Sequence, residues 1–215
     1  LDVQGFPVRG VFDANPRLAG LEIRGQPVRD MEELEAVIAR EGIRIAILTV
    51  SDRASKGEYA DRGGPAAEDW LRRVITTPVE FLRRITPDGR VEVAGELCDL
   101  ADTWQADLIL ATGGTGPSPR DQTPEAMADV INMELPGFGE AMRTANGKVV
   151  ATAILSRQSA GVRGKTLIIT LPGSPNAIAT SLEAIFAAVP YCLDLIGAGW
   201  IETDPAIIKA HRPKT

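Results

Sequence analysis

The sequence contains a single histidine, His211, which lies four residues from the C-terminus. A position so close to a chain end is more typical of a tail than of a core. Catalysis by a serine-histidine or cysteine-histidine pair is therefore not expected. Any chemistry must instead rest on carboxylates, arginines, hydroxyl groups, backbone amides or a bound metal ion.

Cysteine is scarce as well, with only Cys98 and Cys192 in the chain. Both lie in apolar stretches with helical patterning, which predicts buried, unpaired thiols. Neither a Cys-x-x-Cys motif nor a Cys/His spacing typical of zinc sites occurs, so a structural zinc site is not expected. Two unpaired cysteines suit a reducing compartment, and we expect a cytoplasmic protein.

The chain has no excess of positive charge and no long uninterrupted apolar run. Its net charge of -6 argues against a general nucleic-acid binder, because clustered Lys and Arg hold phosphate backbones. The longest apolar stretch, Ala184 to Ile201, is interrupted by Pro190 and Asp194. Neither a membrane span nor a charged-then-apolar leader is predicted. The 44% hydrophobic and 24% charged shares are those of a compact globular protein.

From Ile43 onward, short runs rich in β-branched residues alternate with longer amphipathic segments. This alternation is typical of a βαβ protein with a mostly parallel sheet. The near-continuous apolar run from Leu108 to Ala111 suits a parallel strand that is covered on both faces. We expect strands at 44–50, 79–85, 107–112 and 166–171, and helices at 65–75 and 91–104.

Residues 1–42 have a different character. The tripeptide Pro-Val-Arg occurs at 7–9 and again at 27–29, and a short helix is predicted at 31–40. Apolar residues are too few there for an independent core. We interpret 1–42 as an N-terminal appendage or the end of a preceding domain, and 43–215 as the main domain with a C-terminal tail at 201–215.

Two predicted strands are each followed by a glycine-containing turn and a helix start. The first turn is Thr112-Gly113-Gly114-Thr115-Gly116, and the second contains Gly173 and Ser174. Thr123 and Ser174 are predicted N-caps, each followed by proline. Such turns lie where open α/β sheets bind ligands, and their glycines let the backbone approach a phosphate. The alternative is a tight strand-exit turn. No Walker or Gly-x-Gly-x-x-Gly motif is present.

A cation and a carboxylate, Arg120 and Asp121, follow the first glycine turn. Asp121 could hold magnesium and Arg120 could neutralise phosphate oxygens. The alternative is a surface salt bridge with an aspartate at a helix start.

Further polar residues follow other strands. Ser51 and Asp52 end the first predicted strand at the same edge of the sheet. Asp88 lies in a Pro-Asp-Gly segment after the next strand, where it could be a plain β-turn residue. Ser156 and Arg157 add a hydroxyl and a cation, with an exposed loop pair as the alternative.

The ordered set of motifs resembles the MogA-type molybdopterin adenylyltransferases and the related G domains of molybdenum-cofactor enzymes, including gephyrin. The resemblance runs from about Ile43 to the end of the chain. It is carried by Ser51 to Ser55, Thr112 to Glu125, Pro136 to Glu140, Ala153 to Gln158 and Leu171 to Pro175. Residues 1–42 have no counterpart in this pattern.

The resemblance implies a three-layer α/β/α fold, a homotrimer, and transfer of AMP from magnesium-bound ATP to the terminal phosphate of molybdopterin. The product would be handed over to a molybdenum-insertion enzyme. Asp88 and Asp121 would be the catalytic aspartates and magnesium ligands. Together with the residues above, the expected substrate contacts are Ser51, Asp52, Thr112, Gly113, Gly114, Thr115, Gly116, Arg120, Ser156, Arg157, Gly173 and Ser174.

Two other functions fit the same fold. One is a non-catalytic pterin-binding or scaffolding module, since gephyrin-type domains also serve in assembly and fold does not dictate function. The other is a nucleotide-cleaving hydrolase of the competence-damage type. Asp88 and Asp121 favour the transferase, which needs no histidine because the attacking phosphate is already anionic.

Overall fold

The computed structural model describes residues 11–13, 22–23, 26–30 and 42–213, and the chain divides into units Leu1–Gly42 and Ile43–Thr215. In the first unit, β1 (Val11–Asp13) pairs in parallel with β3 (Gln26–Asp30), and β2 (Glu22–Ile23) pairs antiparallel with β3. The sequence patterns did not predict these short strands. The helix predicted at 31–40 lies outside the described residues.

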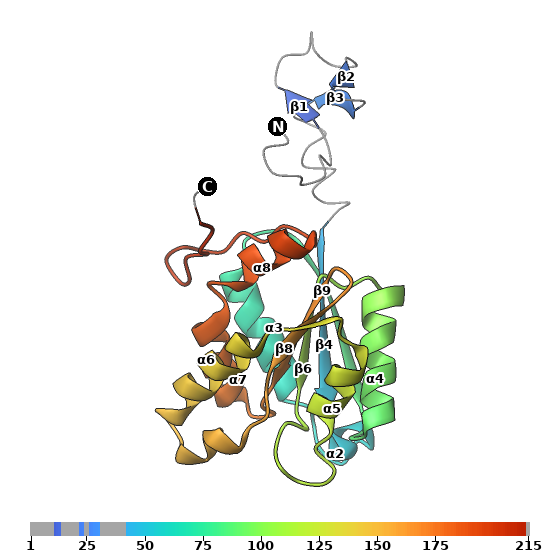
Figure 1. Ribbon diagram of the computed structural model, residues 1–215, viewed down its shortest axis with the longest axis vertical. Coiled ribbons are helices and arrows are strands. Elements are labelled where there is room, and N and C mark those ends of the chain that lie inside the picture. Colours follow the sequence, from blue (N-terminus) through green and yellow to red (C-terminus); the bar gives the residue numbers. More distant parts are fainter. Residues whose placement is uncertain (1–10, 14–21, 24–25, 31–41, 214–215) are drawn as a thin grey trace. The chain divides into compact units, whose positions relative to one another are not determined.

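The second unit is built on a six-stranded sheet with the order β5-β4-β6-β9-β8-β7 (Figure 1). Its first four strands in this order are mutually parallel, β8 runs antiparallel to β9, and β7 antiparallel to β8. The predicted mostly parallel sheet is therefore confirmed. The strands are β4 Ile43–Val50, β5 Val79–Thr86, β6 Leu108–Thr112, β7 Met133–Glu134, β8 Ala160–Arg163 and β9 Thr166–Leu171.

Helices cover both faces of this sheet, which confirms the expected α/β/α fold. One face carries α3 (Gly63–Val74), α6 (Pro136–Gly147), α7 (Pro175–Ile185) and α8 (Val189–Ile196). The other carries α4 (Arg90–Cys98), the π-helical turn η1 (Asp99–Thr103) and α5 (Thr123–Val130). Two short segments, α2 (Asp52–Ser55) and the 3-10 turn η2 (Ala151–Leu155), lie in connections.

Two hydrophobic clusters form the core, one on each side of the sheet. Alternate residues of β4 supply them: Ile45 and Ile47 face α3 and α7, whereas Ala46 and Leu48 face α4 and α5. The inner strands β4, β6 and β9 are mostly apolar because both of their faces are covered, whereas the edge strand β5 also carries Glu80, Arg83 and Arg84.

Two local details differ from the expected pattern. The helix predicted at 91–104 is α4 up to Cys98 and then the π-helical η1, a rare form that occurs mostly as a single turn within an α-helix. Cys98 and Cys192 are unpaired but only half-buried, because each lies at the margin of a core cluster. Burial nevertheless raises the pKa of the Cys192 thiol.

The predicted C-terminal tail packs against the domain as far as it is described. Ile201 is fully buried, and Thr203 pairs with Ile75 in a β-bridge. Arg212 donates to Asp194 at 2.5 Å and lies over the Trp200 ring at 3.7 Å. Among the described residues no single helix is long and apolar enough to cross a membrane, although the bent pair α7 and α8 has the length and composition together.

Candidate functional site

The predicted polar residues lie in loops at one edge of the sheet. Because β5, β4, β6 and β9 are adjacent and parallel, their carboxyl ends meet there. Asp88 follows β5, Asp52 follows β4, the glycine turn follows β6 and Gly173 follows β9. Neighbouring strands are about 4.8 Å apart, so the row of loops spans roughly 15 Å.

The turn after β6 requires glycine for two reasons: its backbone has positive φ values, and there is no room for a Cβ atom. Gly113 and Gly114 have φ values of 101° and 61°. A Cβ on Gly113 would lie 2.3 Å from the Val50 carbonyl oxygen, and one on Gly114 would lie 2.3 Å from Thr123 Oγ1. In the described part of the chain, the N–H groups of Gly114, Thr115 and Gly116 donate to no protein acceptor. Such free amides suit an anionic ligand.

The two predicted helix caps have different outcomes. Ser174 is the N-cap of α7, and its hydroxyl accepts from the Ala177 amide at 3.3 Å. The prediction for Thr123 is wrong, since α5 begins at Thr123 and its N-cap is Gln122. The Thr123 hydroxyl instead donates to the Gly113 carbonyl at 2.9 Å, so it fastens the glycine turn.

Asp52 and Asp88 bind each other's backbone. The Asp52 amide donates to Asp88 Oδ2 at 2.9 Å, and the Asp88 amide donates to Asp52 Oδ1 at 3.1 Å. Among the described residues neither carboxylate forms a salt bridge. Ser51 lies beside the pair, with its Oγ 3.1 Å from the Tyr59 hydroxyl. Two uncompensated carboxylates held this way are well suited to a cation.

Asp121 lies beside the glycine turn, in the segment that leads to α5. Its Oδ2 accepts from the Ser118 amide at 3.2 Å, and a Cβ on Gly116 would lie 2.8 Å from the same oxygen. No hydrogen bond between described residues joins Asp121 to Asp88. Arg120 is exposed, at the mouth of the turn. The joint metal-binding role of Asp88 and Asp121 stays a prediction.

Arg157 holds the loop between the glycine turn and α5. Its Nε donates to the Gly116 carbonyl at 3.0 Å, and its other nitrogens donate to the Asp121 carbonyl and the Glu125 carboxylate. Burial acts to raise the pKa of Glu125, but hydrogen bonding and charge from Arg157 outweigh it and leave that pKa below its ordinary value. Because protein groups occupy all three nitrogens of this guanidinium, Arg157 would support phosphate binding indirectly, by holding the loop in its conformation.

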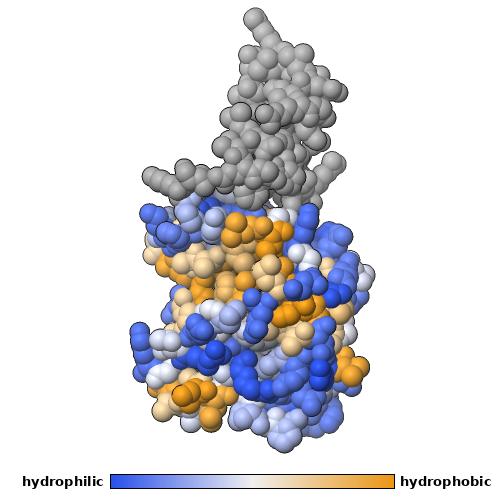
Figure 2. All heavy atoms as spheres, in the orientation of Figure 1, coloured by the Kyte–Doolittle hydropathy of each residue, from blue (hydrophilic) through white to orange (hydrophobic). Residues whose placement is uncertain are grey.

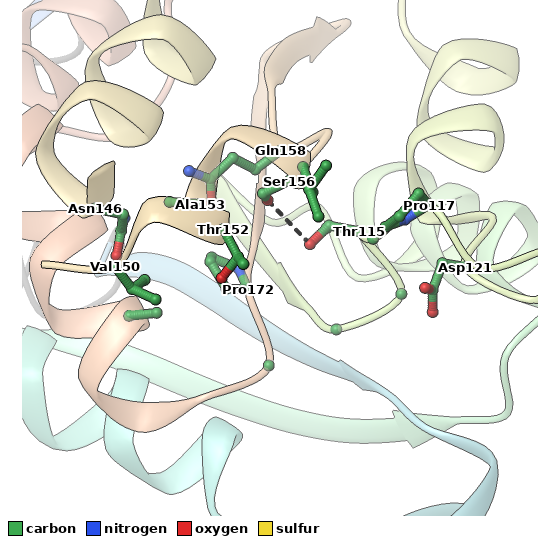
Figure 3. A pocket seen from close by; sticks show the side chains of 16 residues that line it. Thr115, Pro117, Asp121, Asn146, Val150, Thr152, Ala153, Ser156, Gln158 and Pro172 are labelled. Atoms are coloured by element: carbon green, nitrogen blue, oxygen red, sulfur yellow. Dashed lines mark hydrogen bonds between the residues drawn. The ribbon is translucent and has the colours of Figure 1, made fainter. Parts of the chain in front are cut away.

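A cavity of about 400 Å³ opens between the glycine turn, η2 and the start of α7 (Figure 3). Thr115 Oγ1 and Ser156 Oγ lie 3.4 Å apart on its wall. Thr112 is 1% exposed and lies at the strand end, where its hydroxyl has no partner in the described part of the chain. The predicted residues that line the cavity are Gly113, Gly114, Thr115, Gly116, Asp121, Ser156 and Gly173.

Sequence reasoning missed three polar residues of this cavity: Asn146, Thr152 and Gln158. Asn146 is 4% exposed and donates to the Met142 carbonyl and to Ser181 Oγ. Gln158 belongs to a motif that carried the family resemblance, but nothing in the sequence distinguishes a cavity glutamine from a surface one.

Comparison with family models gives two matches. The model described as "Probable molybdopterin binding domain" matches residues 46–191, and the model described as "CoA binding domain" matches residues 2–60. The first covers most of the second unit, including every predicted site residue. About half of the second match lies outside the described residues.

Named relatives and solved structures agree with the first match. The chain is 49% identical to the molybdopterin adenylyltransferase of Helicobacter pylori (strain ATCC 700392 / 26695), over 80% of this chain and 98% of the relative. It is 44% identical to the enzyme of the same name from Escherichia coli K12, over 80% and 95%. The structure of the molybdopterin biosynthesis enzyme MoaB from Thermus thermophilus is 40% identical, with a TM-score of 0.68, over 74% of this chain and 99% of that one.

Proposed function

The chain belongs to the family of molybdopterin adenylyltransferases, and we propose that its reaction takes place where the glycine turn meets the Asp52–Asp88 pair. The chain is an enzyme that adenylylates molybdopterin in molybdenum cofactor biosynthesis. A scaffolding role and a hydrolase activity are not favoured. ATP and molybdopterin are the two substrates.

One observation carries the location of this reaction: free backbone amides and an uncompensated carboxylate pair lie at neighbouring strand ends. A phosphate oxygen of molybdopterin attacks the α-phosphorus of ATP. The new phosphoanhydride bond forms as the bond to the β-phosphate oxygen breaks, and pyrophosphate leaves. The amides of Gly114 to Gly116 and the Arg120 guanidinium offset the charge on the phosphates. The attacking oxygen carries no proton at neutral pH, so a base is not needed.

Magnesium fits the carboxylate pair. Among the described residues no three acidic, His or Cys side chains gather into a site that would hold a metal alone. Magnesium commonly binds through one or two carboxylates and completes its coordination with water and substrate phosphates. We therefore propose Asp52 and Asp88 as its protein ligands, with Asp121 beside the glycine turn. When bound, the ion supplies charge neutralisation at the transferring phosphate.

The decisive test is incubation with molybdopterin and magnesium ATP, followed by identification of adenylylated molybdopterin and stoichiometric pyrophosphate. Cleavage of ATP or of a pyrophosphate bond without molybdopterin would favour the hydrolase instead. Binding of molybdopterin without product would favour the scaffold.

We also propose that the product is passed to a molybdenum-insertion enzyme in the cytoplasm.

We expect a homotrimer in solution, a prediction that rests on the family resemblance and on one exposed surface. Val149, Val150, Ile154 and Leu155 are each 49% exposed or more, and Figure 2 shows apolar surface at the lower left, over the end of α6 and η2. Exposed apolar clusters of this kind commonly mark contacts between proteins. Light scattering should give about three times the 22.9 kDa chain mass. A monomer or dimer mass would refute the prediction.

A chain starting at Glu41 is expected to stay folded and active. All the candidate site residues and both core clusters lie in the unit Ile43–Thr215. The adenylylation rate and the melting temperature of the full-length and shortened proteins should therefore agree closely, although solubility could fall. A shortened protein that is folded yet inactive would mean that residues 1–42 contribute to the active site.

A further inference from the structure

Gln158 is a fully buried side chain whose amide has no protein partner. Its exposed fraction is 0%, and neither Nε2 nor Oε1 makes a hydrogen bond within the described part of the chain. Leaving a buried amide unpaired is unfavourable. The same residue lines the cavity, and Figure 3 shows its side chain beside Ser156 among the other lining groups. An unpaired amide at a cavity wall is well placed to bind a ligand.

The backbone on both sides of Gln158 is held firmly. The Arg157 amide donates to the Thr115 carbonyl at 2.8 Å, and the Ser159 amide donates to Thr170 Oγ1 at 2.8 Å. The Gln158 carbonyl accepts from Arg143 Nη1 at 2.6 Å. These backbone hydrogen bonds therefore fix the position from which the Gln158 side chain extends. Because its amide makes no hydrogen bond, it can turn toward a ligand without losing one.

The position of the cavity indicates which substrate Gln158 would contact. Magnesium binds ATP through the phosphates, so the proposed metal ligands Asp52 and Asp88 place the triphosphate at the ends of β4 and β5. The cavity lies at the other side of the glycine turn, toward β9 and α7. Its remaining walls include the apolar side chains of Pro117, Val150 and Pro172. A flat heterocycle attached to the attacking phosphate fits there.

We propose that Gln158 determines specificity for the pterin ring of molybdopterin, by pairing with its lactam edge. A primary amide presents one donor and one acceptor side by side. The pterin lactam presents a carbonyl oxygen and an adjacent ring N–H, so Nε2 donates to the carbonyl and Oε1 accepts from the N–H. This inference rests on the proposed function, since it takes molybdopterin as the ligand.

Gln158→Leu should raise the KM for molybdopterin about 10- to 100-fold, as expected when one or two hydrogen bonds to a buried ligand group are lost. The KM for ATP should stay within about twofold, since only molybdopterin contacts Gln158. The melting temperature should hold or rise, because an apolar side chain replaces an unpaired buried amide. An unchanged KM for molybdopterin, or a raised KM for ATP alone, would overturn the proposal.

A second variant and a direct binding assay keep the inference testable by itself. Gln158→Glu retains the shape but presents two acceptors, so it should bind free pterin more weakly in a fluorescence titration without ATP. Tighter binding would overturn the assignment of the lactam edge. If wild-type protein binds pterin in a Gln158-dependent way but forms no adenylylated product, the proposed function fails while this inference stands. If product forms and Gln158→Leu behaves as wild type, only the inference fails.

Discussion

Excess EDTA is expected to abolish molybdopterin-dependent pyrophosphate release, and added magnesium is expected to restore it. Asp52 and Asp88 bring two carboxylates together without a protein cation, so the phosphates of ATP would meet uncompensated negative charge in the absence of metal. A pyrophosphate-release assay across a magnesium titration measures the effect. The melting temperature provides the control, since removing a metal held largely by substrate should leave the free protein intact. Full activity in chelator would contradict the prediction.

The sequence was most informative about the sheet. The strands predicted at 44–50 and 166–171 match β4 (Ile43–Val50) and β9 (Thr166–Leu171). Their apolar runs allow few alternatives, because a segment with no polar face must be covered on both sides. The three short strands of the first unit were missed, since residues 1–42 have no comparable apolar run.

The site was predictable where backbone chemistry defines it. The glycine turn is recognisable because consecutive glycines after a buried strand permit the positive φ values that Gly113 and Gly114 adopt. Thr123 was predicted to cap α5, but its hydroxyl instead donates a hydrogen bond to the Gly113 carbonyl. A sequence pattern shows which residue types are suitable as an N-cap. It does not show whether a nearby carbonyl will accept the hydroxyl's hydrogen bond instead.

Pairings between loops could not be predicted. Asp52 and Asp88 are 36 positions apart in sequence, and their reciprocal hydrogen bonds exist only because β4 and β5 are adjacent. Likewise, the sequence indicates a phosphate-binding cation or an exposed residue at Arg157, whereas its guanidinium is occupied by Gly116, Asp121 and Glu125. Long-range geometry decides which polar side chains are left for a ligand.

Replacing Asp88 by Asn is expected to lower turnover about 100- to 1000-fold, with a much smaller change in molybdopterin binding. Loss of a metal ligand removes several kcal/mol of transition-state stabilisation, and each tenfold in rate corresponds to about 1.4 kcal/mol. The asparagine carbonyl can still accept from the Asp52 amide, so the loop should keep its conformation. Rate and binding constant must be measured on the same preparation.

Asp121→Asn distinguishes the two carboxylate positions. If Asp121 acts on the ATP phosphates, its replacement should also lower turnover far more than molybdopterin binding, since the benefit is realised mainly at the transition state. Equal losses in both quantities would mean that Asp121 only shapes the cavity.

Asp102→Asn is the matched control, because Asp102 pairs with Arg163 at the surface, with oxygen-nitrogen distances of 2.6 and 2.9 Å. A control variant as slow as Asp88→Asn would show that any lost aspartate impairs the enzyme and would remove the argument for a metal pair.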